Sequence, residues 1–143
     1  MAAMSQAARE EFLAALHVGV ISVVDPGPER STLTVPIWYR YSPEEGVTVI
    51  TSPTSRKGRA IEASGRFSLV AQRESPPYKY VSVEGPVVET LPCDLEAHLR
   101  PMAVRYLGEE VGNRYAEGWA RQSDSSLVYR MQPEHWYTVD YAT

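Results

Sequence analysis

The sequence predicts a mainly β protein of the β+α class: a small antiparallel barrel of six or so strands, closed or nearly closed, with short flanking helices. Most of the chain alternates between runs rich in Val, Ile, Thr and aromatic residues and breaks rich in Gly and Pro, a pattern typical of strands with short connections. Helix-like segments are fewer. The 143 residues, 43% of them hydrophobic, are enough for one core, so we expect a single domain over residues 1–143.

The expected strands follow one another along the chain. Residues 19–24 are apolar on both faces, which indicates burial in a sheet or barrel wall. Residues 31–41 continue the pattern but are interrupted by Pro36, and a turn then leads into 47–52. The later strands are expected over residues 66–72, 79–91, 126–131 and 136–141. Residues 79–91 form either one strand bent at Gly85 and Pro86 or a strand pair.

Three regions carry helix signals. Residues 5–16 have amphipathic spacing, and residues 58–64 end at a glycine stop signal. Between residues 92 and 122, Asp94 can cap a helix that Pro101 must kink or divide, and a further helix follows over 111–122. An insertion of this kind covers a site, contacts another subunit or plugs the barrel, and the sequence leaves these three roles open.

Composition excludes several classes of protein. The formal net charge of −4 provides no general attraction to nucleic acid or to an anionic membrane surface. A single cysteine, Cys93, excludes an intrachain disulfide, and the three histidines are far apart without metal-ligand spacing, so no metal site is expected. No signal-peptide progression is evident, and no apolar run approaches the ~20 residues that span a bilayer. We therefore expect a soluble, cytoplasmic protein that binds neither nucleic acid nor membrane.

The stretch 51–59 is built like an anion site. A β-branched strand delivers hydroxyl side chains, then Arg56 and Lys57, to the first turn of a helix. The free N–H groups and positive dipole end of a helix favour a phosphate, and two cations would add charge-assisted hydrogen bonds. The alternative is a polar turn in which Thr54 or Ser55 is an ordinary N-cap. Residues alone leave both interpretations open.

Four segments together resemble the pyridoxamine 5'-phosphate oxidase-like, FMN-binding split-barrel family. They are residues 35–39 (Val-Pro-Ile-Trp-Tyr), 50–52 with the Ser-Arg-Lys of 55–57, 78–85 (Tyr-Lys-Tyr-Val-Ser-Val-Glu-Gly) and 131–136 (Met-Gln-Pro-Glu-His-Trp). The resemblance covers about residues 12–140. It is strongest to the short, single-domain branch that includes deazaflavin (coenzyme F420) oxidoreductases, and it implies a six-stranded antiparallel split β-barrel.

The resemblance implies a cofactor site. Its phosphate would be held by the Ser-Arg-Lys turn, which matches Ser55, Arg56 and Lys57. The strand end that contacts the phosphate and the ribityl chain falls on Ile50, Thr51 and Ser52. The strand beside the ring edge corresponds to Val35, Pro36, Ile37 and Trp38. Trp38 either stacks on the ring or fills the core.

The family also implies a homodimer with the cofactor at the interface. The residues that one subunit offers to the partner's pocket correspond to Lys79 and Tyr80. Pyridoxamine-phosphate oxidases themselves carry Arg-Gln at this position, and their N-terminal extension is not evident here. Tyr78 and Tyr80 are candidate proton donors, although an ordinary tyrosine role is the alternative for each.

The resulting functional hypothesis is a flavin- or deazaflavin-dependent oxidoreductase that transfers hydride between bound FMN or F420 and a small organic substrate. The cofactor would supply the chemistry, which suits a sequence without a recognisable catalytic triad or carboxylate pair. Two alternatives remain: a non-catalytic flavin or haem carrier on the same barrel, and an interaction module that binds no cofactor.

Overall fold

The computed structural model describes residues 1–122 and 125–142. These residues form a curled antiparallel sheet, a half-barrel, with four α-helices and one π-helical turn, η1. The helical elements are α1 (Gln6–Ala14), α2 (Arg56–Ser64), η1 (Leu95–Leu99), α3 (Arg100–Leu107) and α4 (Glu109–Ala120). The strands are β1 (Gly19–Val23), β2 (Leu33–Ile37), β3 (Arg40–Ser42), β4 (Gly46–Thr51), β5 (Arg66–Arg73), β6 (Lys79–Pro92), β7 (Leu127–Met131) and β8 (His135–Asp140).

The β+α class is confirmed, but the expected number of strands was wrong: the described residues form eight strands, not six. One reason is that residues 31–41 divide into β2 and β3. The division falls after Ile37, because the backbone N–H of Tyr39 donates to the hydroxyl of Tyr106, at 3.0 Å, and not to a neighbouring strand. Pro36 lies inside β2, opposite Val20 of β1. Proline is tolerated there because β2 lies at the sheet edge and pairs only with β1.

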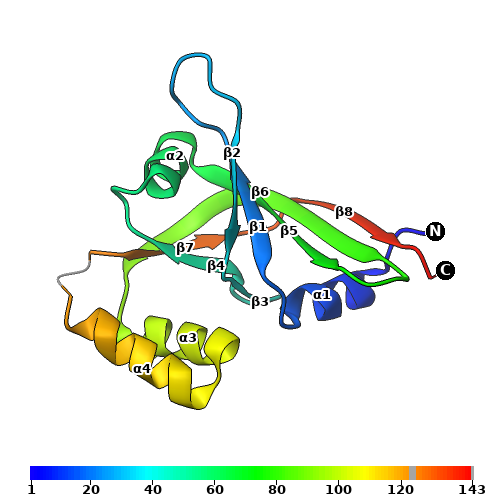
Figure 1. Cartoon of the computed structure of the whole chain (residues 1–143). Helices are drawn as coiled ribbons and strands as arrows, with labels where there is room; N and C mark the ends of the chain where they lie inside the picture. Colours follow the sequence, from blue (N-terminus) through cyan, green and yellow to red (C-terminus); the bar gives the residue numbers. More distant parts are fainter. Residues whose placement is uncertain (123–124, 143) are drawn as a thin grey trace.

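Strand β6 is the axis of the sheet, whose order is β2-β1-β5-β6-β7-β4-β3. Its first half pairs with β5 on one side and β8 on the other, and its second half pairs with β7. Residues 79–91 therefore belong to one continuous strand, with the register shift between Val87 and Glu89. Figure 1 shows β6 crossing the molecule from the end that holds both termini to the end that holds α3 and α4.

Gly85 permits this crossing. A Cβ at Gly85 would overlap the carbonyl of Gln132, in the connection from β7 to β8. That connection lies directly on β6, because the Gln132 N–H donates to the Pro86 carbonyl and the Glu134 N–H donates to the Glu84 carbonyl. The glycine of the Val-Glu-Gly motif therefore has a packing role whether or not a cofactor binds.

The core lies inside the curl of the sheet, where alternate residues of β1, β4, β5 and β6 are buried. Helix α1 closes one end with Leu13, which is fully buried and whose carbonyl accepts a 2.7 Å hydrogen bond from the Tyr39 hydroxyl. At the other end, α3 and α4 pack side by side beneath β4 and β7 (Figure 1). Pro101 lies in the first turn of α3, immediately after η1, so it divides the helical segment as expected. No helix within the described ranges is long and apolar enough to span a bilayer.

Candidate functional site

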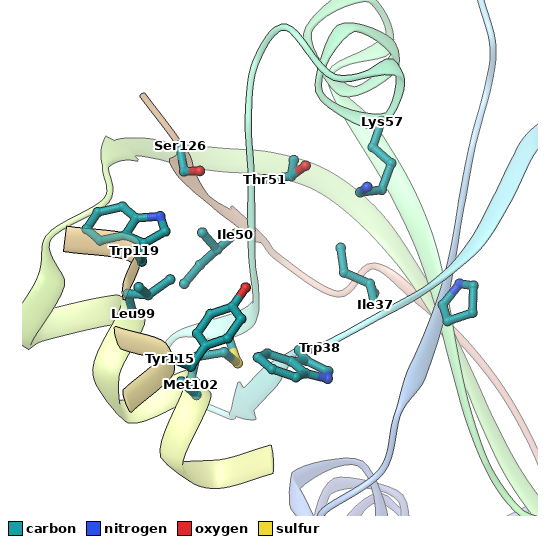
Figure 2. A pocket seen from close by; sticks show the side chains of 12 residues that line it. Ile37, Trp38, Ile50, Thr51, Lys57, Leu99, Met102, Tyr115, Trp119 and Ser126 are labelled. Carbon is teal, nitrogen blue, oxygen red and sulfur yellow. The ribbon is translucent and has the colours of Figure 1, made fainter. Parts of the chain in front are cut away.

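A cavity of about 220 Å³ opens where β2, β4 and α2 face the α3–α4 pair. We call it the first cavity. Figure 2 shows an aromatic and aliphatic wall on one side and the side chains of Lys57 and Thr51 on the other. Its lining residues are Pro36, Ile37, Trp38, Ile50, Thr51, Lys57, Leu99, Met102, Ala103, Tyr115, Trp119 and Ser126. Six of them were predicted from sequence as cofactor-binding residues: Pro36, Ile37, Trp38, Ile50, Thr51 and Lys57.

The turn into α2 positions Lys57. Ser55 is the N-cap: its Oγ accepts the backbone N–H of Gly58 at 3.0 Å and donates to the carbonyl of Ser52 at 2.7 Å. Of the two candidate caps, Ser55 therefore fills the role, and its hydroxyl is committed to the helix start. Gly58 lets the helix approach the strand end, since a Cβ there would lie 2.7 Å from the Cα of Pro53.

The Lys57 side chain points into the first cavity (Figure 2) and is half-buried. Among the described residues it forms no hydrogen bond and no ion pair. The Thr51 hydroxyl lies at the same corner, is only 8% exposed and forms a 3.1 Å hydrogen bond with Ser55 Oγ. A half-buried ammonium without a counter-ion favours an anionic ligand, because its attraction to that ligand is screened less than on the open surface.

Arg56 lies on the opposite side of α2. Its Nε and Nη2 donate to Asp25 Oδ2 at 3.1 and 2.8 Å, beside the loop between β1 and β2. The hydrogen bond from the Gly27 N–H, followed by the Arg56 guanidinium, lowers the pKa of Asp25, so this ion pair persists at neutral pH. Arg56 lines a separate surface hollow with Arg30 and Arg59, not the first cavity. A role for Arg56 at a phosphate remains a prediction, and it requires the side chain to leave Asp25.

The remaining predicted residues lie elsewhere in the same chain. Val35 packs against the core, and Ser52 Oγ bonds the backbone N–H and the hydroxyl of Thr54. The segment Tyr78 to Tyr80 lies at the start of β6, beside β8 and the chain termini and away from α4 (Figure 1). There Lys79 Nζ is 3.5 Å from Asp140, and the Tyr80 ring stacks on Tyr137 with centroids 6.1 Å apart. None of these residues lines the first cavity within one chain.

The helical wall of the first cavity was not predicted from the sequence. Leu99, Met102, Tyr115 and Trp119 all come from the segment 92–122, whose role the sequence left open. Trp38 lies parallel to the ring of Tyr106 at 5.1 Å and contacts Tyr115 at 5.6 Å. The sequence offered one indication of this wall: Tyr115 and Trp119 are four residues apart, and such a pair lies on one face of a helix.

Tyr106 is a positioning residue that the sequence gave no reason to select. Its hydroxyl donates to the carbonyl of His17 at 2.6 Å and accepts the backbone N–H of Tyr39 at 3.0 Å. Its ring covers one face of Trp38. Tyr106 therefore holds the turn between β2 and β3, and with it the orientation of Trp38, against α3.

The described residues contain no group of three or more His, Cys, Asp and Glu side chains that could hold a metal ion. None of the three histidines lines the first cavity. The arrangement is a cation and a hydroxyl beside a group of aromatic and aliphatic side chains. It matches the needs of a ligand with a flat ring system and an anionic tail.

No protein-family model matches this sequence. A search of curated proteins found no match either. Comparison of structures, by contrast, found many proteins that share the fold.

Three of these similar structures carry informative descriptions. One is described as an F420 reductase: it is 19% identical, with a TM-score of 0.71, and the alignment covers 90% of this chain and 94% of that one. A FAD-binding protein from Mesorhizobium loti is 20% identical, with a TM-score of 0.65 and coverages of 96% and 95%. A haem storage protein from Vibrio cholerae is 16% identical, with a TM-score of 0.61 and coverage of 92% of each chain. At such identities the likeness shows the shared fold.

Proposed function

We propose that this protein is an FMN- or F420-dependent oxidoreductase that holds its cofactor in the first cavity, with the cofactor phosphate at Lys57. One observation carries the proposal: Lys57 is a half-buried cation, without a partner among the described residues, directed into an aromatic-walled cavity at a strand-to-helix junction. A shared fold with proteins described as an F420 reductase and a FAD-binding protein supports it.

Different residues of the first cavity would contact different parts of the cofactor. Lys57 and the Thr51 hydroxyl face the anionic end, and Ser55 acts through the helix cap that fixes the backbone around them. Pro36, Ile37 and Trp38 supply a flat apolar edge, and Ile50 lies next to Thr51 on β4. A flavin or deazaflavin bound there would supply hydride transfer, and the chain would bind it, orient it and exclude water from one face.

We propose a homodimer as the functional unit, because one row of residues on the outer face of the sheet is largely apolar where solvent would favour polar residues. Side chains directly opposite one another in a sheet project from the same face. Pro36 lies opposite Val20, Val20 opposite Val70, Val70 opposite Ser82, and Ser82 opposite Tyr137. Tyr137 is 67% exposed. This row crosses the sheet from the rim of the first cavity to β8.

A partner packed on this face would bring its own Tyr80 towards the first cavity, because Tyr80 projects from the same face as Ser82. Lys79 projects from the other face, over the Phe12 ring, and would have to leave Asp140 to reach the partner's cavity. Burial and the neighbouring Tyr137 raise the pKa of Tyr80, so its hydroxyl stays protonated at neutral pH and can donate. Tyr80, with Tyr78 as the second candidate, is the proposed proton donor to a small-molecule substrate.

Val70→Lys tests the dimer, because it places a charge in the largely apolar row. Light scattering should show a monomer for this variant, and a wild-type protein that is monomeric would contradict this part of the proposal.

Cofactor titration tests the site. The protein should quench the fluorescence of FMN, F420 or both, and Lys57→Met should raise the dissociation constant at least tenfold, about 1.4 kcal/mol. That exceeds the loss of up to about 1 kcal/mol expected for an exposed ion pair. The matched control is Arg66→Ala, which removes an exposed cation paired with Glu134 and should leave the affinity unchanged. Equal affinities for wild type and Lys57→Met would refute the phosphate assignment.

A carrier role on the same barrel is the alternative function, supported by the fold shared with a haem storage protein. A haem site needs an axial ligand such as histidine, and the lining of the first cavity includes no histidine. Reduction of the bound flavin or deazaflavin, followed by reoxidation on adding a candidate substrate, separates enzyme from carrier. Binding without turnover across a panel of electron acceptors would favour the carrier.

A further inference from the structure

A second cavity of about 260 Å³ lies between the sheet and the segment of η1 and α3. It shares only Ile50 and Met102 with the first cavity, so these two side chains form the wall between the two spaces. Its lining residues are Arg40, Glu45, Thr48, Ile50, Leu91, Ala97, His98, Met102, Val128 and Arg130. Of these residues, only Ile50 was predicted from sequence to contact a ligand.

Strand register explains why polar groups collect at one end of this cavity. Arg40 of β3 lies opposite Thr48 of β4, Thr48 lies opposite Arg130 of β7, and Arg130 lies opposite Glu89 of β6. Directly opposed residues project from the same face, so these four side chains form one polar row. The neighbouring row is apolar, because Ile50 lies opposite Val128 and Val128 lies opposite Leu91.

The two arginines of the polar row differ in their contacts: Arg130 has partners and Arg40 has none among the described residues. Arg130 is paired with Glu89 and donates from Nε to the Glu45 carbonyl at 3.3 Å, so its charge is already balanced. Arg40 is half-buried and has no hydrogen bond or ion pair among the described residues. Glu45 also borders the cavity, but it is exposed and forms no ion pair with either arginine in the described part of the chain. Arg40 is therefore the one cation of the polar row without a direct partner among the described residues.

The helical side of the cavity adds a further donor. His98 Nδ1 accepts the backbone N–H of Asp94 at 2.9 Å, so the proton of the neutral ring lies on Nε2. Neither Nε2 nor the Thr48 hydroxyl has a partner within residues 1–122 and 125–142. The lining of the second cavity therefore includes a guanidinium, an imidazole N–H and a hydroxyl that have no protein acceptor among the described residues.

We propose that the second cavity is a binding site for a small organic carboxylate, whose carboxylate meets Arg40 and whose apolar part lies on Ile50, Leu91 and Met102. A single uncompensated guanidinium matches a monoanion, and its planar fork suits bidentate carboxylate binding. A dianionic phosphate would require a second free cation. The volume lies below the roughly 300–1,000 Å³ of typical ligand pockets, which limits the ligand to about the size of benzoate. This site is independent of the cofactor proposal, because the two cavities share no polar residue.

Titration with benzoate, followed by amide chemical shifts in the full-length protein, tests the proposal. Benzoate should bind with a dissociation constant of about 1 mM or lower and shift the amide signals of Thr48, His98 and Arg130. Arg40→Gln should weaken binding at least tenfold, and Thr48→Val, an isosteric change, should weaken it severalfold. The matched control Arg73→Gln, an exposed arginine on β5, should leave binding unchanged.

Three further titrations separate this site from other sources of binding. Benzamide, which is neutral and similar in shape, should bind at least tenfold more weakly than benzoate, and so should inorganic phosphate. Lys57→Met should retain benzoate binding, because its cation belongs to the first cavity. The proposal is overturned if benzoate does not bind, if Arg40→Gln binds it like the wild type, if phosphate or benzamide binds as tightly, or if Lys57→Met abolishes binding.

Discussion

Replacing Tyr106 by Phe removes one oxygen atom and tests how the turn between β2 and β3 is held. The ring remains, so the stacking on Trp38 at 5.1 Å is kept. Two hydrogen bonds are lost: the one to the His17 carbonyl at 2.6 Å and the one from the Tyr39 N–H at 3.0 Å. The variant therefore leaves two backbone groups without their partner and creates no large cavity.

The expected loss of stability follows from those two groups. A buried backbone group left unsatisfied costs about 1–3 kcal/mol, and the site is only partly buried, so water replaces part of the lost bonding. We expect the free energy of unfolding to fall by about 2 kcal/mol, and the melting temperature to fall by roughly 6 °C for a chain of this size. Cofactor affinity should fall as well, because Trp38 lies in the released turn.

Guanidinium denaturation followed by tryptophan fluorescence measures this loss. Tyr115→Phe is the matched control: Tyr115 also contacts Trp38, but it is 49% exposed and its hydroxyl has no partner among the described residues. The control should change the free energy of unfolding by less than about 0.5 kcal/mol. If Tyr106→Phe is no less stable than Tyr115→Phe, the hydroxyl does not hold the turn and the reasoning fails.

Three further outcomes are expected. Gly58→Ala should destabilise the protein and weaken cofactor binding, because the new Cβ would lie 2.7 Å from the Cα of Pro53, and a wild-type melting curve would contradict the close approach of α2. Gly118→Ala should instead stabilise by up to about 1 kcal/mol, since a Cβ there meets nothing within 4 Å and alanine favours the helix; a lower melting temperature would refute this. Burial, the largest effect, lowers the pKa of His17 below its usual 6.5, so the unfolded chain binds the proton more tightly. The stabilising contribution of neutral His17 is therefore fully present above pH 6.5 and is lost as pH falls through the folded-state pKa, and His17→Gln should flatten that part of the stability curve.

Local signals in the sequence accounted for much of the secondary structure. Ser55 caps α2 and Gly65 ends it in the left-handed conformation, both as the residue types predict. Pro101 marks the start of α3, and β-branched runs mark the strands. One of the additional strands was missed because the break between β2 and β3 depends on Tyr106, 67 residues further along the chain. A propensity pattern contains no information about such a distant partner.

The candidate site was only partly accessible from sequence for the same reason. Lys57, Thr51 and the segment around Trp38 were predicted because each belongs to a short motif. The different orientations of Arg56 and Lys57 follow from helix geometry and from Asp25, which attracts Arg56 across 31 residues. The wall formed by Leu99, Met102 and Trp119 depends on how α3 and α4 pack against the sheet.

The sequence by itself determined where the chain extends, roughly where its helices lie, and that a hydroxyl-rich turn with two adjacent cations follows β4. These features depend on backbone preferences and on neighbours a few residues away. Only the tertiary structure decided which cation enters the first cavity, which aromatic residues enclose it, and that Arg40, Thr48 and His98 meet in a second cavity. Those outcomes depend on strand register and helix packing, which bring together residues that are distant in the chain.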